Sequence, residues 1–289
     1  MLRRLALGLA LMLALSGMDG ATPATAQPAA TQGRPGLSAA ELQARRARIR
    51  SFFHARLQRL NIVATTGTPS GQTIDWIDPK SQTADGTLAP APEPSVAPPT
   101  PGLTGPPEFS LPGPTAVARL AQTEVQWHPS SRGPDGTVPV VRFDVEQYLA
   151  RVTVPPDDPR DVLRKMPPPA PNANKRYYVA LDRFGTFYGT SGVINLWDPV
   201  GPVNNETSIA QVAVSRGTPV QSVEAGKIEL QSLNGDLQPH FFTYYTTTGY
   251  VQHGDWVGGY NTLVDGWIQV SPTVAPGMVL PASVDGGNR

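Results

Sequence analysis

The sequence predicts a mostly β protein: an antiparallel β-sandwich of jelly-roll type in the C-terminal part, preceded by one helix and a few short strands. From residue 176 onward, aromatic and β-branched runs alternate with glycine and asparagine, as in antiparallel sandwiches. The chain holds 28 glycines and 32 prolines, which favours turns and short strands over long helices. It has no cysteine, so a buried core and not disulfides must stabilise it.

The first 26 residues have the pattern of a secretory signal peptide. Arg3 and Arg4 precede the apolar run Leu5–Leu15, and Ala24-Thr25-Ala26 is a small-x-small cleavage signal. The apolar run is too short for a hydrocarbon core of about 30 Å, and no later stretch is long enough, so we expect no stable membrane insertion. The chain is therefore predicted to be secreted or periplasmic, with an uncleaved N-terminal anchor as the alternative.

Residues 27–166 are predicted to hold one helix and short extended pieces. Ser38-Ala39-Ala40-Glu41 has the form of a capping box and opens a helix with apolar residues at helical spacing. These residues are Leu42, Ile49, Phe53, Leu57 and Leu60. Extended segments are expected at Thr73–Ile77 and, around the turn Gly133–Gly136, at Thr123–Arg142. Between them, residues 89–115 are rich in proline and are expected to form a semi-rigid linker without a fixed fold.

Residues 167–289 are predicted to form the sandwich domain, without helices. The expected strands are Arg176–Asp182, Gly192–Trp197, Ser208–Val214, Val220–Leu230, His240–Thr248 and Gly266–Val270. The charge balance of 23 basic against 23 acidic residues gives no global attraction to polyanions. We therefore expect no nucleic-acid partner.

Several familiar chemistries find no support in the sequence. His54, His128, His240 and His253 are scattered and form no pair that could put two ligands on one metal ion. Gly189–Gly192 lacks the spacing of a serine nucleophile elbow, and it precedes a predicted strand instead of a helix. No glycine-rich phosphate loop is present. We expect neither a metal nor an organic cofactor.

Glu224 is the most informative titratable residue because it is predicted on the apolar face of its strand. The two-residue period of a strand gives it three apolar neighbours: Val220, Ile228 and Leu230. The polar residues of this strand point the other way: Gln221, Lys227 and Glu229. Burial would favour the protonated form of Glu224, as proton transfer near working pH requires. Gly226 is expected to open space for a substrate backbone. The alternatives are a bulge that turns Glu224 to solvent, or a carboxylate buried for structural reasons.

Aromatic residues crowd the same part of the chain. Trp197, Tyr245 and Tyr260 are the candidates for a substrate-binding groove that stacks on proline or sugar rings. Other aromatic residues lie nearby: Tyr244, Tyr250, Trp256 and Trp267. Core packing explains most of them equally well.

Several blocks of the sequence, in a constant order, resemble the neprosin domain. These are Phe187–Pro199 (FYGTSGVINLWDP), Ser222–Gly226 (SVEAG), Phe241–Thr246 (FFTYYT), Gly259–Asn261 (GYN) and Gly266–Gln269 (GWIQ). Upstream, Leu57–Asn61, Thr73–Ile77 and Trp127–Val140 resemble the activation peptide of that family. The resemblance covers most of the chain from Leu57 to Gln269, apart from the proline-rich insert.

The resemblance implies a secreted zymogen with a β-sandwich catalytic part and residues 27–166 as an activation-peptide-like region. The implied activity is proline-directed endopeptidase cleavage by two glutamates and a water, without a cofactor, on a peptide or protein substrate that can be proline-rich. The first glutamate of the family maps onto Glu224, which the strand period also singles out.

Two departures from the family pattern stand out. Gly259 and Val264 occupy positions where the family usually carries cysteines. Only 65 residues follow Glu224, and the second catalytic glutamate of the family has no match among them, so the domain is expected to be C-terminally incomplete and to have little or no peptidase activity. A second carboxylate within about 5 Å of Glu224 would favour an enzyme, and the candidates are Glu206, Asp255 and Asp265. The alternative function is a non-catalytic sandwich that binds proline-rich protein or cell-surface polysaccharide.

Overall fold

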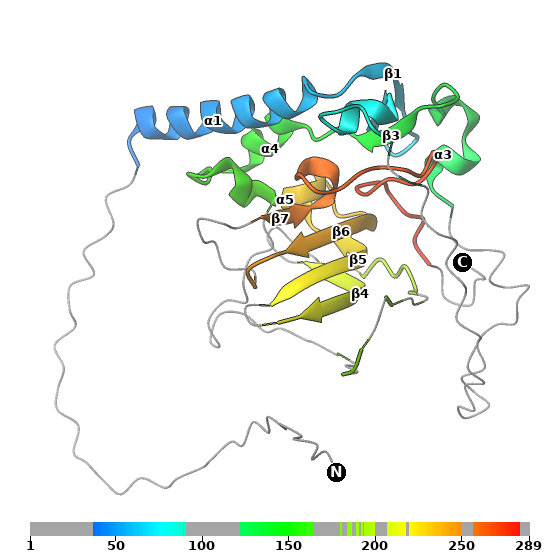
Figure 1. Ribbon diagram of the computed structural model, residues 1–289. Coiled ribbons are helices and arrows are strands. Elements are labelled where there is room, and N and C mark those ends of the chain that lie inside the picture. Colours follow the sequence, from blue (N-terminus) through cyan, green and yellow to red (C-terminus); the bar gives the residue numbers. More distant parts are fainter. Residues whose placement is uncertain are drawn as a thin grey trace, which may run out of the picture. The chain divides into compact units, whose positions relative to one another are not determined.

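Two antiparallel sheets and a long helix carry the fold in this computed structural model (Figure 1). The structure describes residues 37–88, 90, 122–163, 180, 184–186, 189–190, 192, 194–199, 207–217, 220–249 and 257–283. The predicted signal peptide and the proline-rich linker lie outside the described residues, except for the N-terminal edge of the linker at Pro90. The mostly β fold is confirmed, whereas a second sheet packed on the C-terminal one as a sandwich or jelly roll stays a prediction.

Helix α1 (Ala39–Leu57) begins at the predicted capping box. The backbone N–H of Glu41 donates to the Ser38 hydroxyl at 3.2 Å, and the Glu41 carboxylate accepts from the Ser38 backbone N–H at 2.7 Å. These two bonds satisfy backbone donors that a helix N-terminus otherwise leaves unpaired. The helix buries Ile49 and Phe53, and Phe53 stacks on Phe143 with ring centroids 4.4 Å apart.

The first sheet has the order β1-β2-β3 (Ile62–Gly67, Thr73–Ile77 and Val138–Val141). The predicted strand at Thr73–Ile77 is confirmed. The extended segment expected over Thr123–Arg142 is wrong in its first part, where α3 (Glu124–Trp127) and a 3-10 turn (Pro129–Ser131) precede β3. The reason is local capping: the Thr123 backbone N–H donates to the Gln126 side chain at 2.8 Å, and a proline begins the 3-10 turn.

Further short elements join the two sheets. They are η1 (Pro79–Gln82), α4 (Val145–Arg151) and η4 (Pro159–Leu163), all before the second sheet, and α5 (Gln231–Asn234) and η5 (Asn261–Leu263) within the region of that sheet. The one-turn helix α5 and the 3-10 turn η5 were not expected. The α5 turn ends at Gly235, whose φ of 98° suits a residue without a Cβ.

The second sheet has the order β4-β5-β6-β7 (Ser208–Arg216, Gln221–Glu229, His240–Thr246 and Gly258–Tyr260). The predicted strands at Ser208–Val214, Val220–Leu230 and His240–Thr248 are confirmed to within two residues at each end. Strand β7 was missed because two of its three residues are glycines, with φ of 151° and 133°. Positive φ is uncommon in strands, and glycine lacks the β-branched or aromatic side chain that marks a strand in the sequence.

Two other predicted strands do not form. The strand predicted at Gly266–Val270 is wrong. The side chain of Gln82 binds the backbone of Gln269 there: its Nε2 donates to the carbonyl at 2.9 Å, and its Oε1 accepts from the N–H at 2.7 Å. The described residues of Gly192–Trp197 form no strand either. Arg176–Asp182 lies outside the described residues, apart from Ala180.

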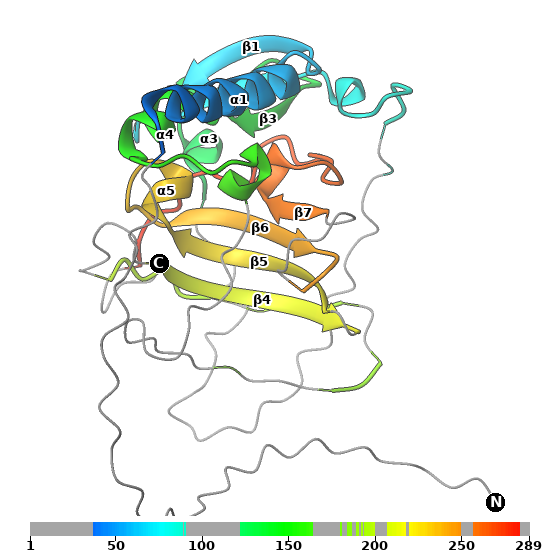
Figure 2. The ribbon, with the colours of Figure 1, turned by 90° about the vertical axis from the view of Figure 1, so that its left-hand side faces the viewer.

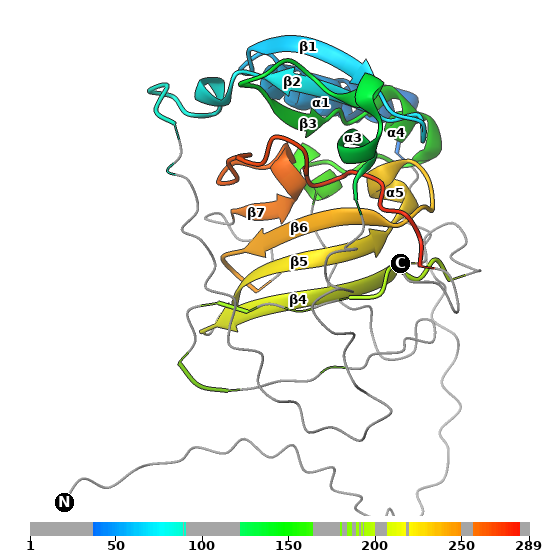
Figure 3. The same ribbon diagram turned by 90° about the vertical axis from the view of Figure 1, so that its right-hand side faces the viewer.

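One apolar core joins the N-terminal region, residues 38–163, to the second sheet. Its buried members come from α1, α4, η4, β5, α5, β6, β7 and the loop after it: Ile49, Phe53, Tyr148, Leu149, Leu163, Ile228, Leu233, Phe242, Tyr244, Tyr260 and Val264. In all ribbon views β7 is the strand of the second sheet nearest to α1 and the first sheet, and β4 is farthest from them (Figures 1, 2 and 3). The N-terminal region therefore packs on the second sheet from the β7 side.

Candidate functional site

The predicted burial of Glu224 on β5 is confirmed, because its side chain is only 1% exposed. The hydroxyl of Ser222, two residues earlier on the same face, donates to Glu224 Oε1 at 3.1 Å. Ile228 on that face is completely buried, whereas Val220 at the start of the strand is 40% exposed. A bulge that turns the carboxylate to solvent is thereby ruled out.

The opposite face of β5 is also covered at its C-terminal end. Lys227 and Glu229 are 3% and 0% exposed and form an ion pair, and the Lys227 ammonium also donates to the Ser208 hydroxyl at 2.9 Å. Burial raises the pKa of Glu229, while the hydrogen bond and charge of Lys227 act in the opposite direction. Because five positions separate Glu229 from Glu224, the two carboxylates lie on opposite faces of the strand.

Strand register places two tyrosines in line with Glu224. Glu224 pairs with Tyr244 on β6, and Tyr244 pairs with Tyr260 on β7. Paired residues of an antiparallel sheet share one face, with Cβ atoms about 4.5–5.5 Å apart. Both tyrosines are buried, and their rings meet edge to face at 4.9 Å. Tyr244 is therefore the neighbour of Glu224 that sequence reasoning did not select, since only the register distinguishes it from Tyr245.

The three predicted substrate-binding aromatics do not lie together. Tyr245 pairs with Gly259, so it lies on the sheet face opposite to Tyr260. The Tyr245 hydroxyl donates to the backbone carbonyl of Asp265, and burial followed by the Asp265 charge raises its pKa. Trp197 is 47% exposed on a separate segment, whose backbone at Leu196 bonds Ser283. A substrate-binding role for these residues stays a prediction.

The expectation that Gly226 opens space for a substrate is wrong. A Cβ at this position would lie 2.1 Å from the backbone oxygen of Ala210 and 2.7 Å from the Cα of Gln211. The backbone of β4 thus occupies the space, and the absent side chain allows the two strands to approach closely.

The expected carboxylate partners of Glu224 gain no support. Asp265 is 74% exposed and bonds Arg56 and Arg59 of the N-terminal region, in contrast to the buried Glu224. Glu206 and Asp255 lie outside the described residues. The two positions where the family usually has cysteines do lie side by side, since a Cβ on Gly259 would be 2.5 Å from Val264 Cγ1.

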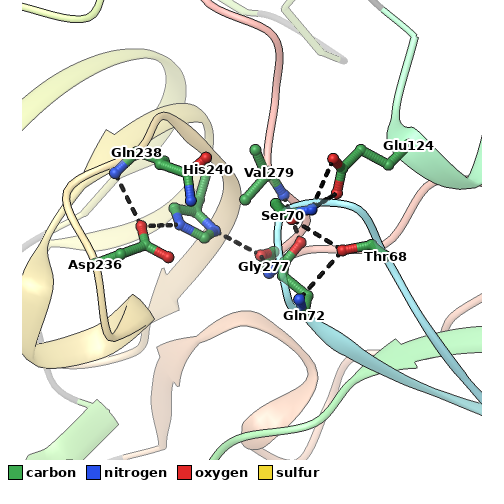
Figure 4. Close-up of polar contacts among 9 residues, drawn as sticks. All are labelled: Thr68, Ser70, Gln72, Glu124, Asp236, Gln238, His240, Gly277 and Val279. Carbon is green, nitrogen blue, oxygen red and sulfur yellow. Dashed lines mark hydrogen bonds and ion pairs between the residues drawn. The ribbon is translucent and has the colours of Figure 1, made fainter.

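A polar network connects β6 to the hairpin between β1 and β2 (Figure 4). His240, 1% exposed, donates from Nδ1 to the carbonyl of Gly277 at 2.7 Å, and its Nε2 lies 2.8 Å from Asp236 Oδ1. The Gln72 amide donates to the same Gly277 carbonyl at 2.8 Å and accepts from the Val279 N–H at 2.8 Å. The sequence pattern around His240 indicates none of these partners, because only the fold brings them together.

Asp236 is the titrating group of this network. Burial raises its pKa, but the hydrogen bond and charge of His240 outweigh burial and hold the pKa below its usual range. Both ring nitrogens of His240 lie within hydrogen-bond distance of oxygen atoms, one of Gly277 and one of Asp236. The network therefore joins the Asp236 carboxylate to the Gly277 backbone through a buried imidazole ring.

Two other kinds of site are absent from the part of the chain that the structure describes. No group of three or more His, Cys, Asp or Glu side chains there could hold a metal ion. No helix there is both long enough and apolar enough to cross a bilayer.

Part of the chain matches the model of a known protein family. The model of the Neprosin family matches residues 204–289. The matched segment contains all four strands of the second sheet and, with them, Glu224, Tyr244 and Tyr260. The block at Phe187–Pro199 and the activation-peptide-like blocks lie outside the match, so their assignment stays a prediction. Over residues 204–289, this chain is therefore similar to the neprosin family.

Proposed function

We propose that the chain is an exported neprosin-like endopeptidase with Glu224 as a catalytic carboxylate. Members of this family are generally extracellular, and the family suggests peptide substrates. The observation that carries the proposal is a glutamate that is only 1% exposed, on a strand face shared with the buried Ser222 and Ile228, within the segment that matches the family model. Its carboxylate accepts from the Ser222 hydroxyl, and strand register places Tyr244 across from it on the same face.

In this proposal Glu224 works with a second carboxylate and a water. One carboxylate takes the proton from the attacking water, and the other, protonated, polarises the scissile carbonyl and then protonates the leaving amine. The residue that supplies the second carboxylate is not assigned. Cleavage next to proline and a proline-rich substrate follow from the family resemblance and belong to the proposal.

We also propose that the N-terminal region acts as an activation-peptide-like cover. Tyr244 and Tyr260 share an apolar core with residues of the N-terminal region: Ile49, Phe53, Leu149 and Leu163. By strand register, these two tyrosines lie on the sheet face that carries Glu224. Substrate can reach that face only after the cover moves, so the covered chain should turn over slowly.

The test is cleavage of a proline-containing peptide from pH 3 to 7 by the wild type and Glu224→Gln, before and after limited proteolysis of the N-terminal region. We expect slow cleavage that needs Glu224 and rises when the cover is cut. Removal of one acid–base partner typically lowers rates by about 10²–10⁴-fold, so Glu224→Gln should lower the rate by that factor. Equal cleavage by both proteins would exclude the catalytic role. Peptide binding without any cleavage by the wild type would favour a non-catalytic binding protein.

A further inference from the structure

A cavity of about 570 Å³ lies away from Glu224, between the N-terminal region and the loop after β7. Its walls come from the C-terminal part of α1, the segment from Ile77 to Gly86, the residues from Val140 to Phe143 and the loop from Thr262 to Trp267. The volume falls within the range of about 300–1,000 Å³ that is usual for small-molecule sites. Neither Glu224 nor Tyr244 lines it.

The mouth of this cavity carries an excess positive charge. Arg56 Nη1 and Arg59 Nη2 both donate to the same oxygen of Asp265, at 3.1 and 3.3 Å. Two guanidinium groups thus share one carboxylate. The Arg56 side chain is only 17% exposed, and burial, its largest influence, lowers its pKa, as expected for a cation that has lost hydration. Arg56, Arg59 and Asp265 together carry one net positive charge, which a bound anion would neutralise.

Apolar side chains form part of the cavity wall, and one residue of that wall, Trp267, has a buried hydrogen-bond donor. Phe53, Phe143 and Trp267 supply aromatic surface, and Leu60, Ile77 and Val140 supply aliphatic surface. Trp267 Nε1 is buried and has no hydrogen-bond acceptor among the described residues. The polar side chain of Gln82 is already engaged with the backbone of Gln269 on both sides. A buried N–H without a partner is uncommon in folded proteins.

We propose that this cavity binds a small carboxylic acid with an apolar, preferably aromatic, body. The carboxylate lies at Arg56 and Arg59, and the body packs among Phe53, Phe143 and Trp267. A free apolar acid and the C-terminal residue of a peptide share this chemistry. Because the cavity walls come from both the N-terminal region and the neprosin-matching segment, such a ligand would hold the two together.

The test is equilibrium binding to the full chain carrying Glu224→Gln, so that the result does not depend on peptidase activity. Binding is followed by tryptophan fluorescence and by the rise in melting temperature. The probes are 4-phenylbutyrate against its neutral analogue 4-phenylbutanol, and N-acetyl-leucyl-phenylalanine as free acid against its amide. We expect each acid to bind at least about tenfold more tightly than its neutral analogue at low salt, with a smaller difference at high salt. Preference for the dipeptide acid over phenylbutyrate would identify a peptide end as the ligand, and the reverse order a free acid.

Matched variants locate the binding site. Arg59→Gln removes a 59% exposed charge from the cavity mouth and should weaken binding of the acids about two- to fivefold, a size typical of exposed charge pairs, while it leaves the alcohol unaffected. Trp267→Phe keeps the aromatic wall but removes the N–H, and should remove the fluorescence response. Arg48→Gln, on the same helix but paired with Asp157, is the control and should change nothing. Equal binding of acid and neutral analogue, no binding of either, or equal loss in the Arg48 and Arg59 variants would overturn the proposal.

Discussion

Replacing Ile49 by alanine tests whether the N-terminal region and the second sheet unfold as one unit. Ile49 lies on α1, is 0% exposed, and belongs to the core that contains Ile228, Phe242 and Tyr244 of the second sheet. Deleting three carbons at such a site removes their transfer free energy and leaves a cavity, which costs about 2–5 kcal/mol in unfolding free energy. We expect about 3 kcal/mol for Ile49→Ala, because its neighbours come from several elements and cannot all close the gap.

Hydrogen exchange distinguishes local from shared destabilisation. If the core is shared, amides of β6 and of α1 should both exchange faster, and 3 kcal/mol corresponds to a factor of about 150 for amides that exchange through global unfolding. Urea unfolding followed by circular dichroism should show one transition with a lower midpoint. Ser51→Ala, exposed on the same helix, is the matched control and should stay within about 0.5 kcal/mol of wild type. Unchanged protection of β6 together with lost protection of α1 would refute a shared core.

Three further predictions follow from single contacts. Gly226→Ala should lower the melting temperature by several degrees, because the new Cβ would lie 2.1 Å from the Ala210 oxygen. Gly67→Ala is the control and should change the melting temperature little, because a Cβ there has nothing within 4 Å. Equal shifts in the two variants would refute the close approach of β4 and β5. Lys227→Met should cost about 3–5 kcal/mol near pH 7 by leaving Glu229 without its partner. Because the folded pKa of Glu229 is already raised, this cost should shrink as the pH falls and Glu229 takes up a proton, and a cost independent of pH would contradict the assignment. The pKa of Asp236 is lowered in the folded state, so its stabilising contribution is present above about pH 4 and is lost as the pH falls through the folded pKa. Asp236→Asn should therefore make the melting temperature depend less on pH over that range. An unchanged pH dependence would contradict this prediction.

Local patterns predicted the elements that local forces determine. The capping box at Ser38 and the inward face of Glu224 on β5 both depend on neighbours within a few residues, and both predictions are confirmed. These signals are readable because helix caps and strand faces repeat over short distances in the chain.

Long-range contacts explain the predictions that were wrong. Gly266–Val270 has strand-like residues, but a glutamine almost two hundred positions earlier holds its backbone. Gly226 was read as a gap for substrate, although a neighbouring strand fills it. The importance of Tyr244 became visible only through its pairing with Glu224 and Tyr260. In each case the deciding contact comes from a residue that no local pattern identifies.

Peptide cleavage by two matched variants tests whether Glu224 is a catalytic carboxylate. Glu224 and Glu229 are both buried carboxylates on β5, but they lie on opposite faces, so Glu229→Gln controls for the loss of a buried charge on the same strand. Each variant is assayed on a proline-containing peptide from pH 3 to 7, after cutting the N-terminal region and well below its melting temperature. We expect Glu224→Gln to abolish cleavage and Glu229→Gln to retain it. Cleavage that survives Glu224→Gln, or that both variants lose equally, would contradict this expectation.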